Sequence, residues 1–194
     1  VRVDATIAFR KELNKREEGV RYSYTDLLVK MAAAALRRFP DINSSLIDNQ
    51  VIRHEEVNVG IAVALDDGLM VPVLRQADAK GLKAIHEGAQ ALIEQTRSNQ
   101  LSMDALKGGT FTISNFGSIA GIFGTPVINY PQVGILGVGR ITEQAVVKNH
   151  QVVAGNVLGL SLSVDHRVVD GGDTARFMKQ IIDHLADPIS LLME

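Results

Sequence analysis

A histidine between charged residues follows the last apolar strand that the sequence predicts. The run "NVLGLSLSV" (156–164) ends at Asp165-His166-Arg167, and Asp170 follows the histidine by four positions. An imidazole titrates near neutral pH, so it can accept and return a proton, and a carboxylate can fix its geometry directly or through a cation. The pattern alone leaves two interpretations open, a general base and a structural histidine.

A serine ends a second predicted strand. Ser114 lies at the end of "GTFTISNF" (109–116) and precedes the glycine-rich "GSIAGIFGTP". Serine and asparagine also favour ordinary turns. A Ser-His-Asp hydrolase is one interpretation, but Ser114 has no G-x-S-x-G elbow around it. A hydroxyl that donates a hydrogen bond to an oxyanion fits Ser114 better than a nucleophile does.

Composition excludes several other kinds of chemistry. The 194 residues carry a net charge of −2, which provides no basic field for nucleic acid or an anionic membrane. No apolar run approaches the roughly 20 residues of a membrane span. The absence of cysteine excludes disulfides, a thiolate nucleophile and cysteine-ligated metals, so any thiol must come with the substrate. No histidine pair has metal-ligand spacing, and we expect no metal site.

The hydrophobic periodicity predicts an α/β fold with a mixed sheet flanked by helices. Helices are expected over 5–18, 24–39, 81–97 and 172–187, the first capped by Asp4 and the second by a capping box of Ser23 and Asp26. A hairpin is expected around "DDG" (66–68) and another around Asn149. His86 and His184 are expected on solvated helix faces, with other histidines near turns.

Asp165 to Gly171 resemble the D-H-R-x-x-D-G signature of dihydrolipoyl acyltransferases, the core components of 2-oxo acid dehydrogenase complexes. The blocks "AFRKEL", "FPDINSSL", "GGTFTISNFGSI" and "PVINYPQVGILGVGRI" resemble family blocks in family order. The resemblance covers nearly the whole chain and implies a chloramphenicol acetyltransferase-like fold. Residues 1–194 are then expected to form a single acyltransferase catalytic domain, without the lipoyl and peripheral-subunit-binding domains.

The resemblance implies a role for each of the three polar residues. His166 would be the general base that deprotonates the thiol of coenzyme A, and Ser114 would donate a hydrogen bond to the tetrahedral oxyanion. Asp170 would support the geometry by pairing with an arginine upstream of the first helix. The resemblance also implies that six residues contact coenzyme A, namely Arg10, Ser23, Asn115, Ser118, Gly139 and Ile141.

The resemblance also implies the assembly and its partners. Homotrimers, with His166 and Ser114 from neighbouring subunits, would build a core of 24 or 60 subunits, and the apolar Leu191, Leu192 and Met193 would join trimers. Lipoyl domains would deliver acyl groups from a 2-oxo acid dehydrogenase, alongside a dihydrolipoyl dehydrogenase. The compartment would be a prokaryotic cytoplasm or the mitochondrial matrix.

These residues are compatible with three functions. Acyl transfer from a dihydrolipoyl arm to coenzyme A, with an acetyl or branched-chain acyl group, fits the motif best. An antibiotic O-acyltransferase on the same fold is an alternative, although such enzymes tend to show a histidine pair where Asp165 and His166 stand. A noncatalytic scaffold subunit is a third, but such relatives typically lose the base.

Overall fold

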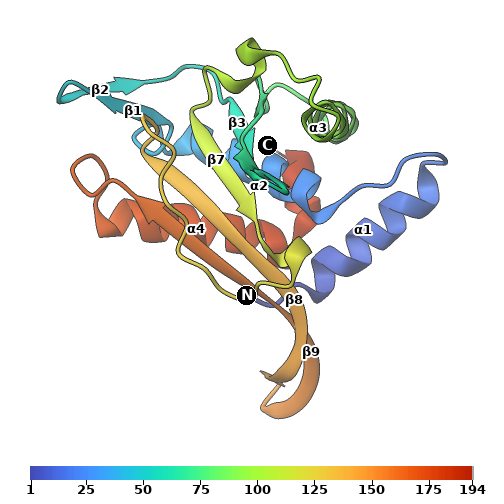
Figure 1. The fold of residues 1–194 in the computed structure, drawn as a ribbon. Helices are drawn as coiled ribbons and strands as arrows, with labels where there is room; N and C mark the ends of the chain where they lie inside the picture. The colour runs from blue at the N-terminus through green and yellow to red at the C-terminus, as the bar shows by residue number, and fades with distance from the viewer. Residues whose placement is uncertain (194) are drawn as a thin grey trace.

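The core of the protein is a five-stranded mixed sheet. The computed structural model describes residues 1–193, and its main sheet has the order β6-β3-β7-β8-β9 (Figure 1). β3, β7 and β8 run parallel, whereas β6 and β9 pair antiparallel at the two edges. The predicted mixed sheet is confirmed. The strands are β6 (Val73–Leu74), β3 (Val59–Ile61), β7 (Phe111–Asn115), β8 (Gly134–Lys148) and β9 (Gln151–Val164).

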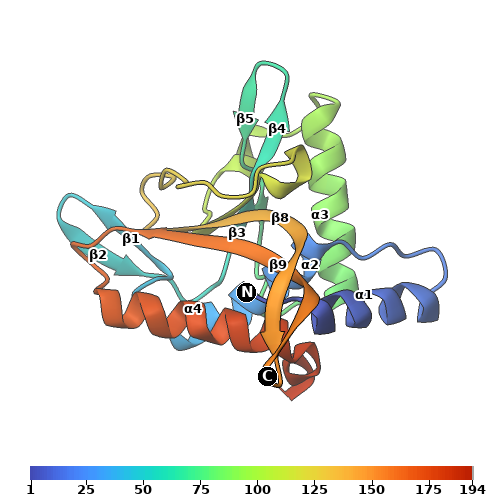
Figure 2. The same cartoon turned by 90° about the horizontal axis from the view of Figure 1, so that it is seen from below.

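Four α-helices accompany the sheet within the described residues, and α2 lies between α3 and α4 (Figures 1 and 2). The helices are α1 (Asp4–Arg16), α2 (Tyr24–Arg38), α3 (Leu82–Arg97) and α4 (Gly171–Ala186), with short 3-10 turns at η1 (Met103–Leu106), η2 (Gly117–Ile119) and η3 (Pro188–Met193). The capping box before α2 is confirmed. The predicted cap at Asp4 is wrong, because its carboxylate accepts from the backbone and side chain of Asn156 on β9 instead.

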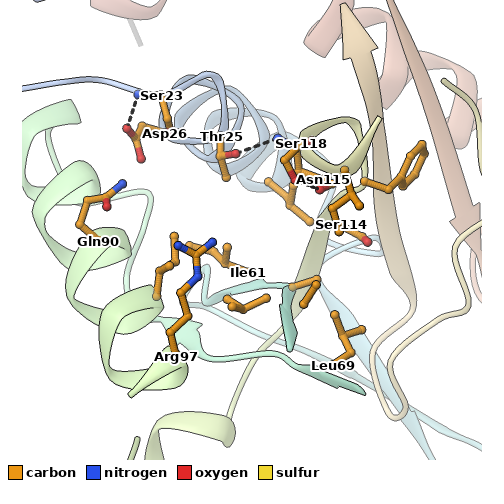
Figure 3. A pocket seen from close by; sticks show the side chains of 17 residues that line it. Ser23, Thr25, Asp26, Ile61, Leu69, Gln90, Arg97, Ser114, Asn115 and Ser118 are labelled. Carbon is orange, nitrogen blue, oxygen red and sulfur yellow. Dashed lines mark hydrogen bonds between the residues drawn. The ribbon is translucent and has the colours of Figure 1, made fainter. Parts of the chain in front are cut away.

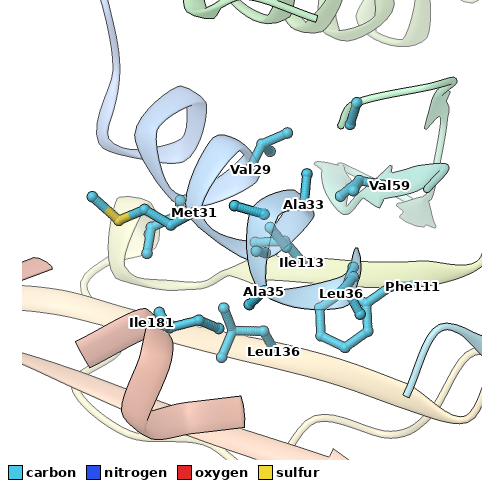
Figure 4. Close-up of a cluster of buried hydrophobic side chains, with 14 of the residues drawn as sticks. Val29, Met31, Ala33, Ala35, Leu36, Val59, Phe111, Ile113, Leu136 and Ile181 are labelled. Carbon is cyan, nitrogen blue, oxygen red and sulfur yellow. The ribbon is translucent and has the colours of Figure 1, made fainter. Parts of the chain in front are cut away.

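Helix α2 is the centre of the core because its alanines and leucines are buried nearly all round. Figure 4 shows its side chains facing Phe111 and Ile113 of β7, Leu136 of β8 and Ile181 of α4. A helix that is apolar on most of its circumference must be covered on all sides. α2 is therefore the fixed element around which the sheet and the other helices are placed.

Two small hairpins lie outside the main sheet. β4 (Val63–Leu65) and β5 (Gly68–Met70) form the projecting tip of the hairpin predicted around "DDG", whose base is β3 and β6 (Figure 2). The hairpin of β1 (Ser44–Ile47) and β2 (Gln50–Arg53) was not predicted. Within residues 1–193, no helix combines the length and apolar character of a membrane span.

The prediction of solvated faces for two helical histidines is wrong. His184 is only 4% exposed, and its Nδ1 lies 2.9 Å from Ser190 Oγ. His86 Nδ1 lies 2.8 Å from the buried carboxylate of Asp26. Both helix faces pack against other elements, which neighbouring acids in the sequence do not reveal.

The apolar C-terminal segment is also placed differently from the expectation. Leu191 is 9% exposed and joins the hydrophobic core, because η3 folds back against α4 and α1. Leu191 is therefore not available on the surface of the protomer to join trimers, contrary to the expectation. The side chains of Leu192 and Met193 lie outside the described part of the chain, so the same expectation for them stays a prediction.

Candidate active site

Two adjoining cavities open beside the start of α2. The first, called the Ser114 cavity, has a volume of about 470 Å³ and lies between α2, α3 and the ends of β3 and β7 (Figure 3). The second, called the Arg10 cavity, has a volume of about 340 Å³ and lies between α1, α2 and β8. The polar side chains around the Ser114 cavity include Ser23, Thr25, Asp26, Gln90, Arg97, Ser114 and Asn115.

The Arg10 cavity brings together all six residues expected to contact coenzyme A. Arg10, Ser23, Asn115, Ser118, Gly139 and Ile141 line it. They come from α1, the start of α2, the end of β7, η2 and β8, so only the folded chain collects them. Four residues, Ser23, Thr25, Asn115 and Ser118, line both cavities and therefore mark the junction between them.

Local hydrogen bonds fix the α2 side of the junction. Ser23 N donates to Asp26 Oδ2 at 2.7 Å, and Asp26 N donates to Ser23 Oγ at 3.1 Å, which closes the capping box. The Asp26 side chain is 1% exposed and is also bonded to His86 of α3. A buried carboxylate bonded to both Ser23 N and His86 Nδ1 holds the first turn of α2 in one place. Ser23 is positioned by its own sequence motif and by α3.

Arg10 is held over the Arg10 cavity by two contacts. Its Nε donates to the carbonyl oxygen of Tyr22 at 2.6 Å, and its guanidinium carbon lies 4.6 Å from the centre of the Tyr24 ring. Among the described residues, no acid pairs with Arg10. A guanidinium fixed in this way suits a phosphate, which it can bind with two parallel hydrogen bonds. Burial and the carboxylate of Glu17 raise the pKa of Tyr22 to about 12, so the neighbouring phenol stays neutral.

A bulge in β8 forms the opposite wall of the Arg10 cavity. The pairing of β8 with β9 shifts between Val138 and Ile141. Arg140 N donates to the carbonyl oxygen of Gly121 at 2.8 Å, so the loop after η2 lies directly on the bulge. A β-carbon at Gly139 would collide with the carbonyl oxygen of Ile122, and the close approach requires glycine there.

Ser114 and His166 lie at different ends of the sheet within one chain. Ser114 pairs with Gly137 of β8, whereas Val164, the end of β9, pairs with Gly134. Val164 is therefore three residues further along the sheet than Ser114 and, because β8 lies between β7 and β9, two strands away from it. At the usual rise per residue and strand spacing, the Cα atoms of Ser114 and Val164 are about 14 Å apart. His166 lies in the turn beyond Val164, outside hydrogen-bond reach of Ser114 in the same chain.

The turn that carries His166 is held by its neighbours. Asp165 accepts from the backbone N–H of Arg167 at 3.0 Å and pairs with its guanidinium at 2.6 Å. Arg167 lowers the pKa of Asp165 through this bond. His166 is exposed, and no described residue forms a hydrogen bond with its ring. Its imidazole is therefore presented outward rather than buried.

Asp170 has a structural role that the sequence did not suggest. It is the N-cap of α4, and its carboxylate accepts from Asp173 N at 2.8 Å. This bond, with a bond from the Gly172 N–H and the charges of Arg176 and His166, lowers the pKa of Asp170. The expected pairing of Asp170 with an arginine upstream of the first helix stays a prediction.

Three site residues were not predicted, namely Thr25, Gln90 and Arg97. Gln90 and Arg97 follow one face of α3, and Figure 3 shows them facing the Ser114 cavity. Because Gln90 and Arg97 are seven residues apart, the sequence could have predicted that they share one face of the helix. That this face lies beside Ser114 can be seen only in the folded structure. The described residues contain no group of three or more acidic or histidine side chains that could hold a metal ion.

The sequence matches a known protein family over almost its whole length. The model of the 2-oxoacid dehydrogenases acyltransferase catalytic domain matches residues 1–193. This chain belongs to that family. It is 40% identical to the dihydrolipoyllysine-residue acetyltransferase component of the Bacillus subtilis pyruvate dehydrogenase complex, and 38% identical to the succinyltransferase component of the Pseudomonas aeruginosa 2-oxoglutarate dehydrogenase complex. Both matches cover 99% of this chain but only 45% and 47% of those relatives.

Solved structures of several acyltransferases have the same fold as this chain. The dihydrolipoamide acetyltransferase of Azotobacter vinelandii superimposes with a TM-score of 0.93 at 40% identity, covering 98% of this chain and 80% of that one. The cubic core of a pyruvate dehydrogenase multienzyme complex gives the same TM-score and identity over 99% of this chain and 81% of that one. Chloramphenicol acetyltransferase, at 13% identity and a TM-score of 0.63 over 95% and 85% of the two chains, shares the fold alone. The predicted fold of this acyltransferase domain is confirmed.

The capping role of Asp170 predicts a pH-dependent stability. Asp170→Ala should lower the melting temperature at pH 7, whereas Asp170→Asn can still accept from Asp173 N and should lower it less. The folded-state pKa lies below the ordinary 3.8, so the carboxylate stabilises the fold above that value and loses this effect as the pH falls through the lower pKa. The melting temperatures of wild type and Asp170→Asn should therefore move towards each other as the pH is lowered from 7 to 3. An equal melting temperature for Asp170→Ala and wild type at pH 7 would contradict the cap.

Proposed function

We propose that this domain transfers an acyl group from S-acyl-dihydrolipoyl-lysine to coenzyme A within a 2-oxo acid dehydrogenase complex. The observation that carries the proposal is the Arg10 cavity, which collects all six residues expected to contact coenzyme A and adjoins the cavity of Ser114. Arg10 would bind the phosphorylated end of coenzyme A, and the bulge at Gly139 and Ile141 would contact its arm.

The proposed reaction needs a base and an oxyanion donor. A free thiol has a pKa of about 8.5, so it is mostly protonated at neutral pH, and its thiolate is the nucleophile. His166 takes the proton from the coenzyme A sulfur, and the sulfur forms a bond to the acyl carbonyl carbon. Ser114 donates a hydrogen bond to the resulting oxyanion. When the intermediate collapses, the bond to the dihydrolipoyl sulfur breaks and His166 returns the proton to that sulfur.

The Azotobacter vinelandii enzyme supports this choice of residues. A serine, a histidine 52 positions later and an asparagine four positions after the histidine were investigated for their role in its catalytic mechanism. Ser114, His166 and Asp170 have the same spacing in this chain. Asparagine and aspartate are both preferred N-caps. The capping of α4 behind His166 is therefore compatible with either residue.

The active site is proposed to lie between subunits of a homotrimer. Since His166 and Ser114 do not meet within one chain, His166 would face Ser114 of a neighbouring copy. η2 and the loop that joins it to β8 support this arrangement because they expose large apolar side chains that an isolated subunit would leave in water. They are Ile119, Ile122, Phe123, Val127 and Tyr130.

The larger assembly and its partners follow from the proposed reaction. The cubic core formed by a structural relative favours 24 subunits, with 60 subunits as the alternative. Lipoyl domains would carry acyl groups from the 2-oxo acid dehydrogenase component, and dihydrolipoyl dehydrogenase would reoxidise the arm. Residues 1–194 would supply the catalytic domain. An antibiotic O-acyltransferase and a noncatalytic scaffold are the less favoured alternatives.

Replacing either proposed reactive group should greatly reduce transfer to coenzyme A. His166→Ala removes the base, and Ser114→Ala removes one oxyanion donor, for which a loss of about 10²–10³ in kcat is expected. His150→Ala, at the exposed tip of the β8–β9 hairpin, is the matched control and should keep wild-type turnover. The assay is the formation of acetyl-coenzyme A from acetyl-dihydrolipoamide. Near-normal turnover by His166→Ala would contradict the proposed mechanism.

The identity of the acyl group can be tested with three donors. Several acetyltransferase components of pyruvate dehydrogenase complexes, at 38–41% identity to this chain, favour an acetyl donor, with a branched-chain acyl group as the second candidate. Acetyl- or isobutyryl-dihydrolipoamide should therefore give a higher kcat/KM than succinyl-dihydrolipoamide. One methylene changes discrimination by only about 1–3 kcal/mol, so all three must be measured on the same preparation. The highest kcat/KM for the succinyl donor would contradict this assignment.

A further inference from the structure

One side-chain hydrogen bond crosses the junction between the Ser114 cavity and the Arg10 cavity. Asn115 Nδ2 donates to Thr25 Oγ1 at 3.0 Å, and Figure 3 shows this bond between the two labelled residues. Thr25 lies in the first turn of α2, whereas Asn115 ends β7 directly after Ser114. The bond therefore joins two walls that are 90 positions apart in the sequence.

Asn115 is held at its main chain as well. Ser118 Oγ donates to the carbonyl oxygen of Asn115 at 2.9 Å, and Asn115 pairs with Val138 of β8. With the backbone fixed, the amide retains freedom only about its side-chain torsions, and the bond to Thr25 selects one rotamer. Among the described residues, no donor reaches Asn115 Oδ1. This carbonyl oxygen is consequently available to a ligand at the junction.

We infer that Thr25 is a positioning residue for the thiol arm of coenzyme A. The inference rests on the proposed function, in which the arm must pass from the Arg10 cavity to Ser114. The four residues shared by both cavities bound that passage. By fixing the Asn115 amide, Thr25 keeps the passage open in one geometry and presents Oδ1 as an acceptor for an amide N–H of the arm. Thr25 itself takes no part in the proton transfer.

The location of the bond determines which kinetic parameter it affects. The phosphorylated end of coenzyme A would be bound at Arg10, at the far side of the Arg10 cavity, whereas the bond acts on the reactive end. An amide free to rotate at the junction would misplace the thiol relative to the acyl carbonyl, and small misplacements of reacting atoms are costly. Loss of the bond should therefore lower kcat more than it weakens the binding of coenzyme A.

The test compares Thr25→Val with Thr25→Ser. Valine preserves the shape of threonine but removes the hydroxyl, whereas serine keeps it. Thr25→Val should reduce kcat by about tenfold, as expected for the loss of one hydrogen bond at a half-buried site. Thr25→Ser should stay within about twofold of wild type, and the dissociation constant for coenzyme A, from calorimetry, should change less than about threefold for both.

Thr142→Val is a matched control because Thr142 also accepts a hydrogen bond from a side-chain amide, that of Gln144 at 2.9 Å, but lies on the β8–β9 hairpin. It should keep wild-type kcat. Unchanged kcat in Thr25→Val would overturn the inference, as would an equal loss in Thr25→Ser. The two failures are distinguishable, since an inactive wild-type protein would contradict the proposed function, whereas equally active wild type and Thr25→Val would contradict only the role of Thr25.

Discussion

The pairing of β7, β8 and β9 keeps the two reactive side chains of the proposed mechanism apart. Ser114 stands opposite Gly137, and the strand that leads to His166 ends opposite Gly134, two strands away. A shift of register would turn the alternating side chains of a strand to the other face of the sheet and expose core residues, so this separation is fixed by the core itself. The protomer carries both groups, but a second copy must bring them together.

Helix α2 links this sheet to the coenzyme A site. Its buried side chains fix it against β7 and β8, and its first turn carries Ser23 and Thr25 at the junction of the two cavities. The buried Asp26 joins that turn to α3 through His86. The α2 wall of both cavities is thus anchored in the hydrophobic core, as a preorganised site requires.

The sequence predicted the elements better than the contacts between them. The strand ends at Ser114 and His166 and the capping box at Ser23 are local patterns, and the structure contains them. The burial of His184 and Leu191 was missed because it depends on which elements pack against α4 and η3. The sequence did not predict the bond from Asn115 to Thr25 for the same reason, since no local sequence pattern indicates a contact between residues 90 positions apart.

Mixing two inactive variants tests most directly whether the site forms between copies. Protomers with His166→Ala retain Ser114, and protomers with Ser114→Ala retain His166. If neighbouring subunits share each site, an equimolar mixture refolded together should recover about a quarter of wild-type activity, because about one interface in four then combines both intact residues. A refolded mixture no more active than either variant alone would contradict a shared site.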